Sequence, residues 1–403
     1  MKQIGRILAW LAMFAPCFAF CQIDPVQRDL VQLGYNQYFQ GHVPFAGYAF
    51  YYHNRPDFYR TNLTYRLALA PVYLDSELGF VHGLGPNTDY AIGLAGGGFS
   101  DSYNEIHQGK FVPGQSFIGH GGEVSQSVYH LFNPEDRIPL NLVVRGTFHY
   151  TAYERSDNTD PAFQLPDNRG EFIFRGGFRW GGVEPTLFPE LAMELSVWYE
   201  GEYRTDGGPY GVANAYAVES HSHLFWSEAA LSYTLPKSQQ NVYLRLTAGS
   251  SIDADRFSAY RLGGFLPLIA EYPLSLPGYY YQEISARQFV LLNANYLFPL
   301  DREKRWNVNL NWSTAFVDYL SGEDQPGNWL SGAGGGIQYR TPDSRFKIML
   351  SYAYGVDAIR SGGRGAHSVG LLLQLDLGKL RGKDFNTTQP QHWRGWQWLL
   401  PSP

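Results

Sequence analysis

Apolar and polar residues alternate with a period of two along most of the chain from about residue 44, which is the pattern of half-buried β-strands. Between residues 138 and 151, for example, Leu140 and Leu142 share one face, while Arg145 and Thr147 lie on the other. The pattern predicts strands at 44–53, 58–70, 72–82, 89–98, 121–131, 138–151, 170–180, 190–204, 223–235, 241–250, 285–298, 305–317, 329–340, 345–355 and 366–377.

The connections between these runs alternate in length. The short ones are 133–137, 235–241, 299–304 and 341–344, and the long ones are 99–120, 152–169, 205–222, 251–284, 318–328 and 356–365. Short turns at one end and long loops at the other are typical of outer-membrane barrels, in which the short turns face the periplasm. We therefore predict an all-β fold, a transmembrane antiparallel β-barrel with both termini periplasmic.

The number of recognisable runs is odd, whereas bacterial single-chain barrels have an even number of strands. The parity of the loops places the missing strand before about residue 72. Either Gly34–Phe39 is a strand or the region 58–82 contains an extra turn. We predict about sixteen strands in total, in a barrel spanning 42–378. The segment 22–41 forms a short periplasmic helix or the first strand.

Composition separates this barrel from a soluble β-sandwich or propeller, which also alternates. Aromatic residues make up 16% of the chain and charged residues 17%, against about 25% charged in soluble domains. The charges fall on the face opposite to the aromatic residues, as expected where a charge facing lipid costs about 2–4 kcal/mol. The net charge of −6 and the lack of a basic patch argue against a nucleic-acid partner. The expected partners are outer-membrane lipid and a client protein or small solute.

The N-terminus has the features of a secretory signal peptide. Lys2 and Arg6 precede a short apolar run, and small residues before Gln22 suit cleavage after residue 21. Both cysteines, Cys17 and Cys21, lie in this segment 1–21, so we expect an exported protein without disulfides. The expected location is the outer membrane of a Gram-negative-type bacterium.

Charged residues on the inward parity form an expected ladder in the lumen: Arg145, Arg175, Arg179, Glu194, Glu200, Glu202, Glu228 and Arg245. Opposite charges on neighbouring strands stabilise one another. We favour a wall of ion pairs that only solvates the interior, with a selective or gated aqueous lumen as the alternative.

No motif for catalysis or metal binding stands out. Residues 114–119 have the wrong spacing for a nucleophile elbow, so we predict no enzyme activity and no cofactor. Two weak candidates for a cation site lie in expected outer loops, and we predict that neither binds a metal. One is His221 with His223, and the other is Asp253 and Asp255 together with Asp157 or Asp160.

The loop 251–284 is unusually long, has no strand or helix period, and is rich in aromatic residues. Structureless loops of this length are uncommon in compact folds and tend to be functional. We expect it to fold into the lumen. Its motif residues are Tyr260, Arg261, Gly263 and Gly264, followed by Pro277, Gly278 and Tyr279.

These residues, with Asn293–Leu300 and Phe316–Asp318, resemble the BamA/TamA-like surface-antigen superfamily of sixteen-stranded outer-membrane barrels. The resemblance covers 241–377. It implies a lumen loop between the strands at 241–250 and 285–298, and a role in barrel assembly or protein translocation.

The chain departs from the family pattern at the loop. Pro277 stands where the family has an arginine that pairs with an aspartate of the neighbouring strand, here Asp318. Asn295 stands where the family has a glutamate. Arg261 or Arg287 could replace the missing arginine, or the tyrosines that follow Gly278 could hold the loop by packing.

Two further departures concern the ends of the chain. The segment 22–41 is too short for the periplasmic domains of about 75 residues that family members carry. The tail 379–403 contains three tryptophans, which suit a membrane interface, although a loosely folded tail is an equal alternative. The leading functional hypothesis is a factor in outer-membrane biogenesis or translocation. The alternative is a passive or gated channel with the loop 251–284 as its plug.

Overall fold

The computed structural model describes residues 26–43, 45–136, 138–182, 191–235, 237–267 and 273–380. The predicted signal peptide 1–21 and residues 381–403 of the tail lie outside this part of the chain. Among the described residues, no helix has the length and apolar character needed to cross a membrane.

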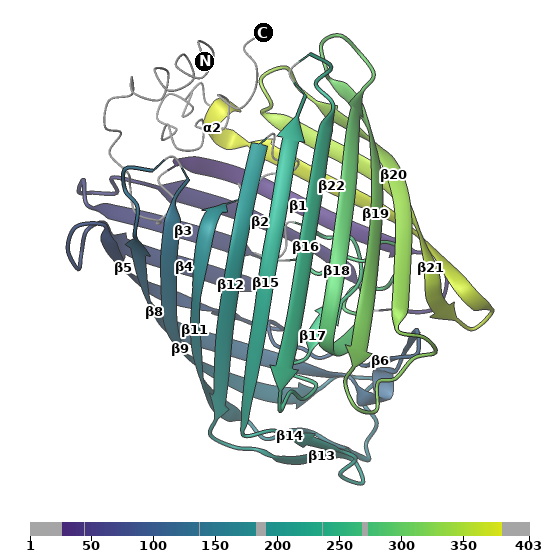
Figure 1. The fold of residues 1–403 in the computed structure, drawn as a ribbon. Helices are drawn as coiled ribbons and strands as arrows, with labels where there is room; N and C mark the ends of the chain where they lie inside the picture. The colour runs from purple at the N-terminus through teal and green to yellow at the C-terminus, as the bar shows by residue number, and fades with distance from the viewer. Residues whose placement is uncertain are drawn as a thin grey trace, which may run out of the picture.

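Sixteen antiparallel strands form a closed transmembrane barrel, as predicted (Figure 1). In chain order they are β1 Arg28–Tyr38, β2 Ala46–Arg55, β3 Leu63–Ala70, β4 Tyr73–Phe80, β5 Thr88–Gly97, β8 Phe117–Leu131, β9 Leu140–Arg155, β11 Arg169–Gly182, β12 Leu191–Arg204, β15 His221–Thr234, β16 Asn241–Ile252, β18 Ile284–Pro299, β19 Trp306–Tyr319, β20 Trp329–Arg340, β21 Phe346–Arg360 and β22 Gly363–Asp376. Each strand pairs with the next in sequence, and β1 pairs with β22 to close the ring.

The strand missing from the sequence pattern is β1. It contains most of Gly34–Phe39, so the first of the two alternatives is confirmed, but it begins earlier, at Arg28. A helix over this part of 22–41 is wrong, and the barrel starts before residue 42. The physical reason is that β1 hydrogen-bonds to β2 on one side and to β22 on the other. Closing the barrel leaves no unpaired sheet edge in the membrane. These hydrogen bonds hold residues 28–38 as a strand even though their alternation of apolar and polar residues is weak.

The expected long loop 356–365 is also wrong. Strands β21 and β22 continue through it and leave only residues 361 and 362 between them. The register shifts between Gly355 and Ile359, which is a bulge in β21. A bulge interrupts the period of two, and this explains why the pattern was lost in the sequence.

The two faces of the wall follow the predicted parity. Phe172, Phe174 and Leu310 point outward and are exposed, whereas Asn309 and Asn311 point inward and are buried. The exposed aromatic and aliphatic side chains form the surface that contacts lipid. The polar face lines the lumen.

The remaining short elements lie in the longer connections: β6 Ile106–His107, β7 Lys110–Phe111, the 3-10 helix η1 Pro113–Gln115, β10 Phe163–Gln164, β13 Gly208–Val212, β14 Tyr216–Val218 and β17 Tyr260–Leu262. Helix α2, Leu377–Leu380, follows β22. Figure 1 shows β6, β13 and β14 at the end of the barrel opposite to helix α2. We call this the long-loop end.

An aromatic cluster joins several connections at the long-loop end. Tyr103, Phe117, Phe163 and Tyr210 are buried together, with Phe257 packed against them. The rings of Tyr103 and Phe257 are 5.7 Å apart between centroids. Such contacts tie separate loops into one unit, which we call the loop cap (residues 98–116, 156–168, 205–220 and 320–328).

Candidate functional site

The loop between β16 and β18 is folded into the barrel over its described residues, 253–267 and 273–283, as predicted, and we call these residues the inward loop. Leu262, Leu276 and Tyr279 are fully buried in one cluster. Ala315 on β19 and Ala358 on β21 belong to the same cluster. The aromatic and aliphatic side chains of the loop are therefore buried against the inner wall.

The two glycine motifs of the inward loop lie next to each other. Leu276 N donates to Gly264 O at 2.9 Å, and Gly263 N donates to Leu274 O at 3.0 Å. Gly278 has a φ of +87°, and a Cβ there would lie 1.9 Å from Gly355 N. Glycine is therefore required at residue 278 both by its backbone conformation and by its contact with β21.

The Pro277 position, where the family pattern has an arginine, packs directly on the barrel wall. A Cβ at Gly332 of β20 would lie 2.1 Å from Pro277 O. Asn293 of β18 donates from Nδ2 to Ser275 O at 2.8 Å. The loop backbone around Pro277 thus packs against the inner wall, where the family pattern has an arginine side chain.

An ion pair with the opposite polarity holds the end of the loop. Arg360 of β21 donates from Nη1 to Glu283 Oε1 at 2.8 Å and from Nη2 to Glu283 Oε2 at 3.0 Å. The guanidinium also stacks on the ring of Tyr280, 3.6 Å from its centroid. Here the loop supplies the carboxylate and the wall supplies the arginine. Both residues were missed from sequence because they fell within the predicted loops 251–284 and 356–365, where periodicity assigns no face.

A second anchor lies at the start of the inward loop. Arg204 of β12 donates from Nη1 to Asp255 Oδ2 at 2.8 Å, and it also pairs with Glu171 and Glu202 at 2.6 Å. Asp255 is 6% exposed. It is therefore a buried partner of the wall and not an exposed residue of an outer loop.

Asp318 does pair with Arg287, with Nη2 2.6 Å from Oδ2, but this pair does not hold the inward loop. Both side chains are about half exposed. The register shift lies in β18 between Ala286 and Gln288. Asp318 therefore lies on the same outward face of β19 as Phe316, two residues before it, and does not face the lumen.

The other candidate partners lie elsewhere. Arg261 donates from Nη2 to Gln282 O at 2.8 Å and to Asn104 O at 3.1 Å, so it links the inward loop to the loop cap. Asn295 lies opposite Asn311 in the lumen wall.

The expected charge ladder is divided among separate contacts. Arg175 pairs with Glu200 at 2.5 Å, and Arg245 pairs with Glu228 at 3.3 Å. Three other members interact with residues outside the expected set: Arg145 with Glu77, Glu202 with Arg204, and Glu194 with Ser196. Arg179 lies opposite Ser196 in the strand register. These local pairs favour the interpretation of the ladder as a structural wall.

The inward loop also contacts the seam between β1 and β22. Tyr280 donates from its hydroxyl to Gln40 O at 2.6 Å, and its ring meets that of Tyr38 edge-on at 5.1 Å. Phe265 packs against Leu372 of β22. A single loop therefore touches strands from the two ends of the barrel sequence.

The seam itself is fully paired. Its register runs from Leu30 opposite Asp376 to Tyr38 opposite Ser368. Inside the barrel, Gln32 donates from Nε2 to Gln374 Oε1 at 3.1 Å. The barrel is closed in this state.

The histidine pair expected in an outer loop begins strand β15 instead. His221 lies 3.5 Å from Asp253, measured from Nε2 to Oδ2, and His223 Nδ1 lies 2.9 Å from the Tyr199 hydroxyl. Each imidazole thus has its own neighbour.

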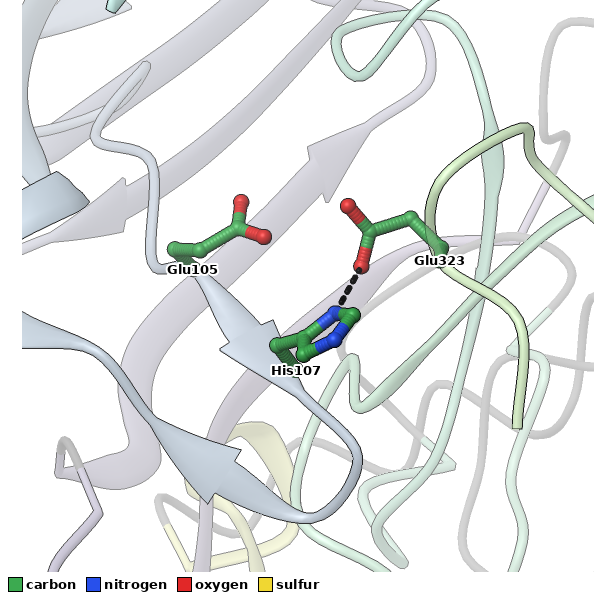
Figure 2. A group of neighbouring side chains, drawn as sticks. All are labelled: Glu105, His107 and Glu323. Carbon is green, nitrogen blue, oxygen red and sulfur yellow. Dashed lines mark ion pairs between the residues drawn. The ribbon is translucent and has the colours of Figure 1, made fainter. Parts of the chain in front are cut away.

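One group of side chains in the loop cap does bring potential metal ligands together. Glu105, His107 and Glu323 lie close to one another (Figure 2), with Arg256 beside both carboxylates. Burial, with the nearby Glu105 carboxylate, raises the pKa of Glu323 to about 7. Sequence offered no signal for this group, because its members lie on separate connections.

No protein-family profile matches the sequence, and no curated protein matches it. Solved structures do match. CdiB from Acinetobacter baumannii aligns at a TM-score of 0.57 and 9% identity, over 87% of this chain and 60% of that one. CdiB from Escherichia coli gives 0.57 and 11%, over 87% and 63%. BamA from Haemophilus ducreyi lacking POTRA domains 1–3 gives 0.52 and 11%, over 86% and 70%.

The chain thus spans less than two thirds of the length of either CdiB structure. The predicted resemblance to BamA-like barrels is confirmed at the level of structure. The protein therefore shares its fold with the BamA and CdiB barrels.

Proposed function

We propose that this protein is an outer-membrane barrel that acts on a protein or lipid client at its β1–β22 seam, in membrane assembly or translocation. The observation that carries the proposal is the contact of the inward loop with both seam strands, through Tyr280 with Tyr38 and Phe265 with Leu372. The shared fold with BamA and CdiB supports the same general kind of function. In this proposal the short turns and both termini face the periplasm.

The seam is suited to opening because it joins the first and last strands of the barrel, which no hairpin connects. Separating β1 from β22 breaks only hydrogen bonds and side-chain contacts, and the exposed edges then need new partners within the membrane. A client strand or a reorganised lipid can supply them. Since the inward loop supports both strands from inside, its position and the state of the seam are coupled.

The rival function is a gated channel with the inward loop as its plug. The loop fills part of a lumen whose wall carries charged and amide side chains such as Arg175, Glu200 and Asn309. Both functions require the loop to move. They differ in whether the seam must also open.

A reversible crosslink across the seam separates the two functions. Gln32 and Gln374 lie directly opposite each other and point into the lumen, so we suggest a Q32C/Q374C variant. Liposomes containing the oxidised or the reduced variant are compared in two assays. One follows the folding rate of an unfolded outer-membrane test barrel, and the other follows ion conductance.

We expect the wild-type chain and the reduced variant to accelerate folding of the test barrel, and oxidation to abolish the acceleration. Equal acceleration in the oxidised and reduced states would contradict action at the seam. Steady single-channel currents that persist after oxidation, without any acceleration of folding, would establish the channel instead. A second crosslink, L33C/L373C at the next pair along the seam, controls for local distortion.

A further inference from the structure

Three potential metal ligands converge in the loop cap from two distant connections. Glu105 and His107 lie at β6, after strand β5, and Glu323 lies in the connection between β19 and β20. Each offers one ligand atom, and the three atoms lie within 4.8 Å of one another. Figure 2 shows both carboxylates and the imidazole turned toward a common point.

The carboxylate oxygens of Glu105 and Glu323 face two neighbours, Arg256 and His107. Arg256 approaches Glu323 at Oε1 and Glu105 at Oε2. The second oxygen of Glu323, Oε2, faces His107 Nδ1 instead. The arginine therefore sits beside the group and leaves one oxygen of Glu323 turned toward the imidazole.

The distance between Glu323 Oε2 and His107 Nδ1 is 3.5 Å. Two ligands of a tetrahedral zinc ion, each at about 2.0–2.1 Å from the metal, are separated by roughly 3.3 Å. The two atoms are therefore already spaced as neighbouring ligands of one ion. One carboxylate oxygen of Glu105 lies within 4.8 Å of both atoms, so the three side chains face one common position.

The group is held in place and is open to solvent on one side. Gln108, next to His107, donates from Nε2 to Asp324 O at 3.1 Å, and the Glu105 backbone N donates to Ser116 Oγ at 3.0 Å. Glu105 and Glu323 are buried, whereas the side chain of His107 is 46% exposed. Buried, fixed carboxylates with an exposed imidazole give an ion an entry path and a largely preformed site.

We propose that Glu105, His107 and Glu323 bind one divalent transition-metal ion, with Zn²⁺ as the best match. One imidazole and two carboxylates form a borderline donor set, and three protein ligands leave a fourth position for water. The ion would join the β6–β7 hairpin to residues 320–328 and so stabilise the loop cap. This inference concerns the loop cap alone and holds whether the barrel acts at its seam or as a channel.

The test is a calorimetric titration of the detergent-solubilised, chelator-treated protein with ZnCl₂. We expect one equivalent to bind, and we expect H107A and E323Q each to weaken binding at least about tenfold, since each loses a direct ligand. H107A is the primary variant, because His107 is exposed and its removal leaves the packing intact. The heat-dependent gel shift of the folded barrel checks that every variant is folded.

The matched control is H120A. His120 Nε2 lies 3.0 Å from Glu154 Oε1, which makes another His–Glu pair with an exposed imidazole, but one outside the group of three. Zinc binding by H120A equal to that of wild type supports the site. No saturable binding by wild type, equal binding by H107A, or loss of binding in H120A would each overturn it. In a second readout, zinc should slow trypsin cleavage after Lys110 in wild type and leave the rate in H107A unchanged.

Discussion

Arg360 and Glu283 form a buried ion pair with two hydrogen bonds, of 2.8 and 3.0 Å, that fastens the inward loop to strand β21. The Arg360 side chain is 4% exposed and that of Glu283 is fully buried. In the family pattern the loop supplies an arginine and the wall supplies an aspartate, but Pro277 replaces that arginine in this chain. The chain instead places the carboxylate in the loop and the arginine on the wall, so the electrostatic contact is retained with its polarity exchanged.

Removing one partner of this pair should loosen the inward loop strongly. For R360Q or E283Q we expect a loss of about 3–5 kcal/mol in the free energy of unfolding, because a buried charge is left without its partner. The measurement is the midpoint of urea unfolding, followed by the gel shift of the folded barrel. The exposed pair Arg287–Asp318 is the control, and D318N should cost no more than about 1 kcal/mol. Equal losses in the two pairs would contradict a special role for Arg360.

Gly278 should tolerate no side chain. In G278A the new Cβ meets Gly355 N, and the positive φ adds backbone strain, so we expect a loss of about 2–5 kcal/mol in total. Gly322 has a similar φ of +85° but nothing within 4 Å of its Cβ position, so G322A shows the cost of conformation alone. The difference between the two unfolding midpoints measures the contact with the wall. If the two variants lose equal stability, the loop does not approach β21 this closely.

Acid should release the connection 98–116 from the barrel wall. Asp101 Oδ2 lies 2.6 Å from His149 Nε2 and accepts a hydrogen bond from the Thr151 hydroxyl at 2.5 Å. Burial alone would raise the pKa of Asp101, but these hydrogen bonds outweigh it and hold the pKa below its usual value. The anchor is therefore fully present above the unfolded-state pKa of about 4, and it is lost as the pH falls through the lower folded-state value.

This pH dependence can be measured by hydrogen exchange of the amides of 98–116 between pH 3 and pH 6, corrected for intrinsic exchange rates. Protection should fall toward pH 3 in wild type, whereas D101N should have low protection at every pH. The exposed Asp157 provides the control, and D157N should behave as wild type. Protection in wild type that does not change with pH would rule out Asp101 as the anchor.

A charge on the outer face of β19 should lower the free energy of unfolding strongly near the middle of the strand and only slightly near its end. Leu310 and Trp306 both point outward and are exposed, but Trp306 is the first residue of the strand. We expect L310R to cost about 2–4 kcal/mol and W306R about 0–1 kcal/mol, because the cost falls with distance from the bilayer midplane. Both values come from unfolding of the barrel in lipid vesicles. A similar cost at both positions would contradict the proposed orientation of β19 in the membrane.

Most of the fold could be predicted from sequence because each barrel strand has one face toward lipid and one toward the lumen, and its residues alternate accordingly. Phe172, Phe174 and Phe178 alternate with Arg175 and Arg179 since lipid and lumen lie on opposite sides of β11. The prediction failed where the period of two was weak or interrupted, at β1 and at the bulge after Gly355.

The candidate site was less predictable, since its contacts join residues far apart in the sequence. Arg204 is the last residue of β12, whereas Asp255 lies in the connection between β16 and β18. Neither strand periodicity nor motif spacing relates the two residues. Glu105 follows β5 and Glu323 follows β19, so eight of the sixteen barrel strands lie between them along the chain. Burial of Asp255 could not be foreseen because a loop has no period that assigns a face to its side chains.

The sequence by itself determined a closed antiparallel barrel, the faces of its strands and the existence of a long loop inside it, because each follows from local alternation and loop length. Tertiary structure alone decided how that loop is held. The missing arginine at Pro277 pointed to packing or to Arg287, but the closed barrel brings Arg360 to Glu283 and Arg204 to Asp255. Buried charges need partners wherever the fold places them, and only the curvature of the barrel determines which residues meet.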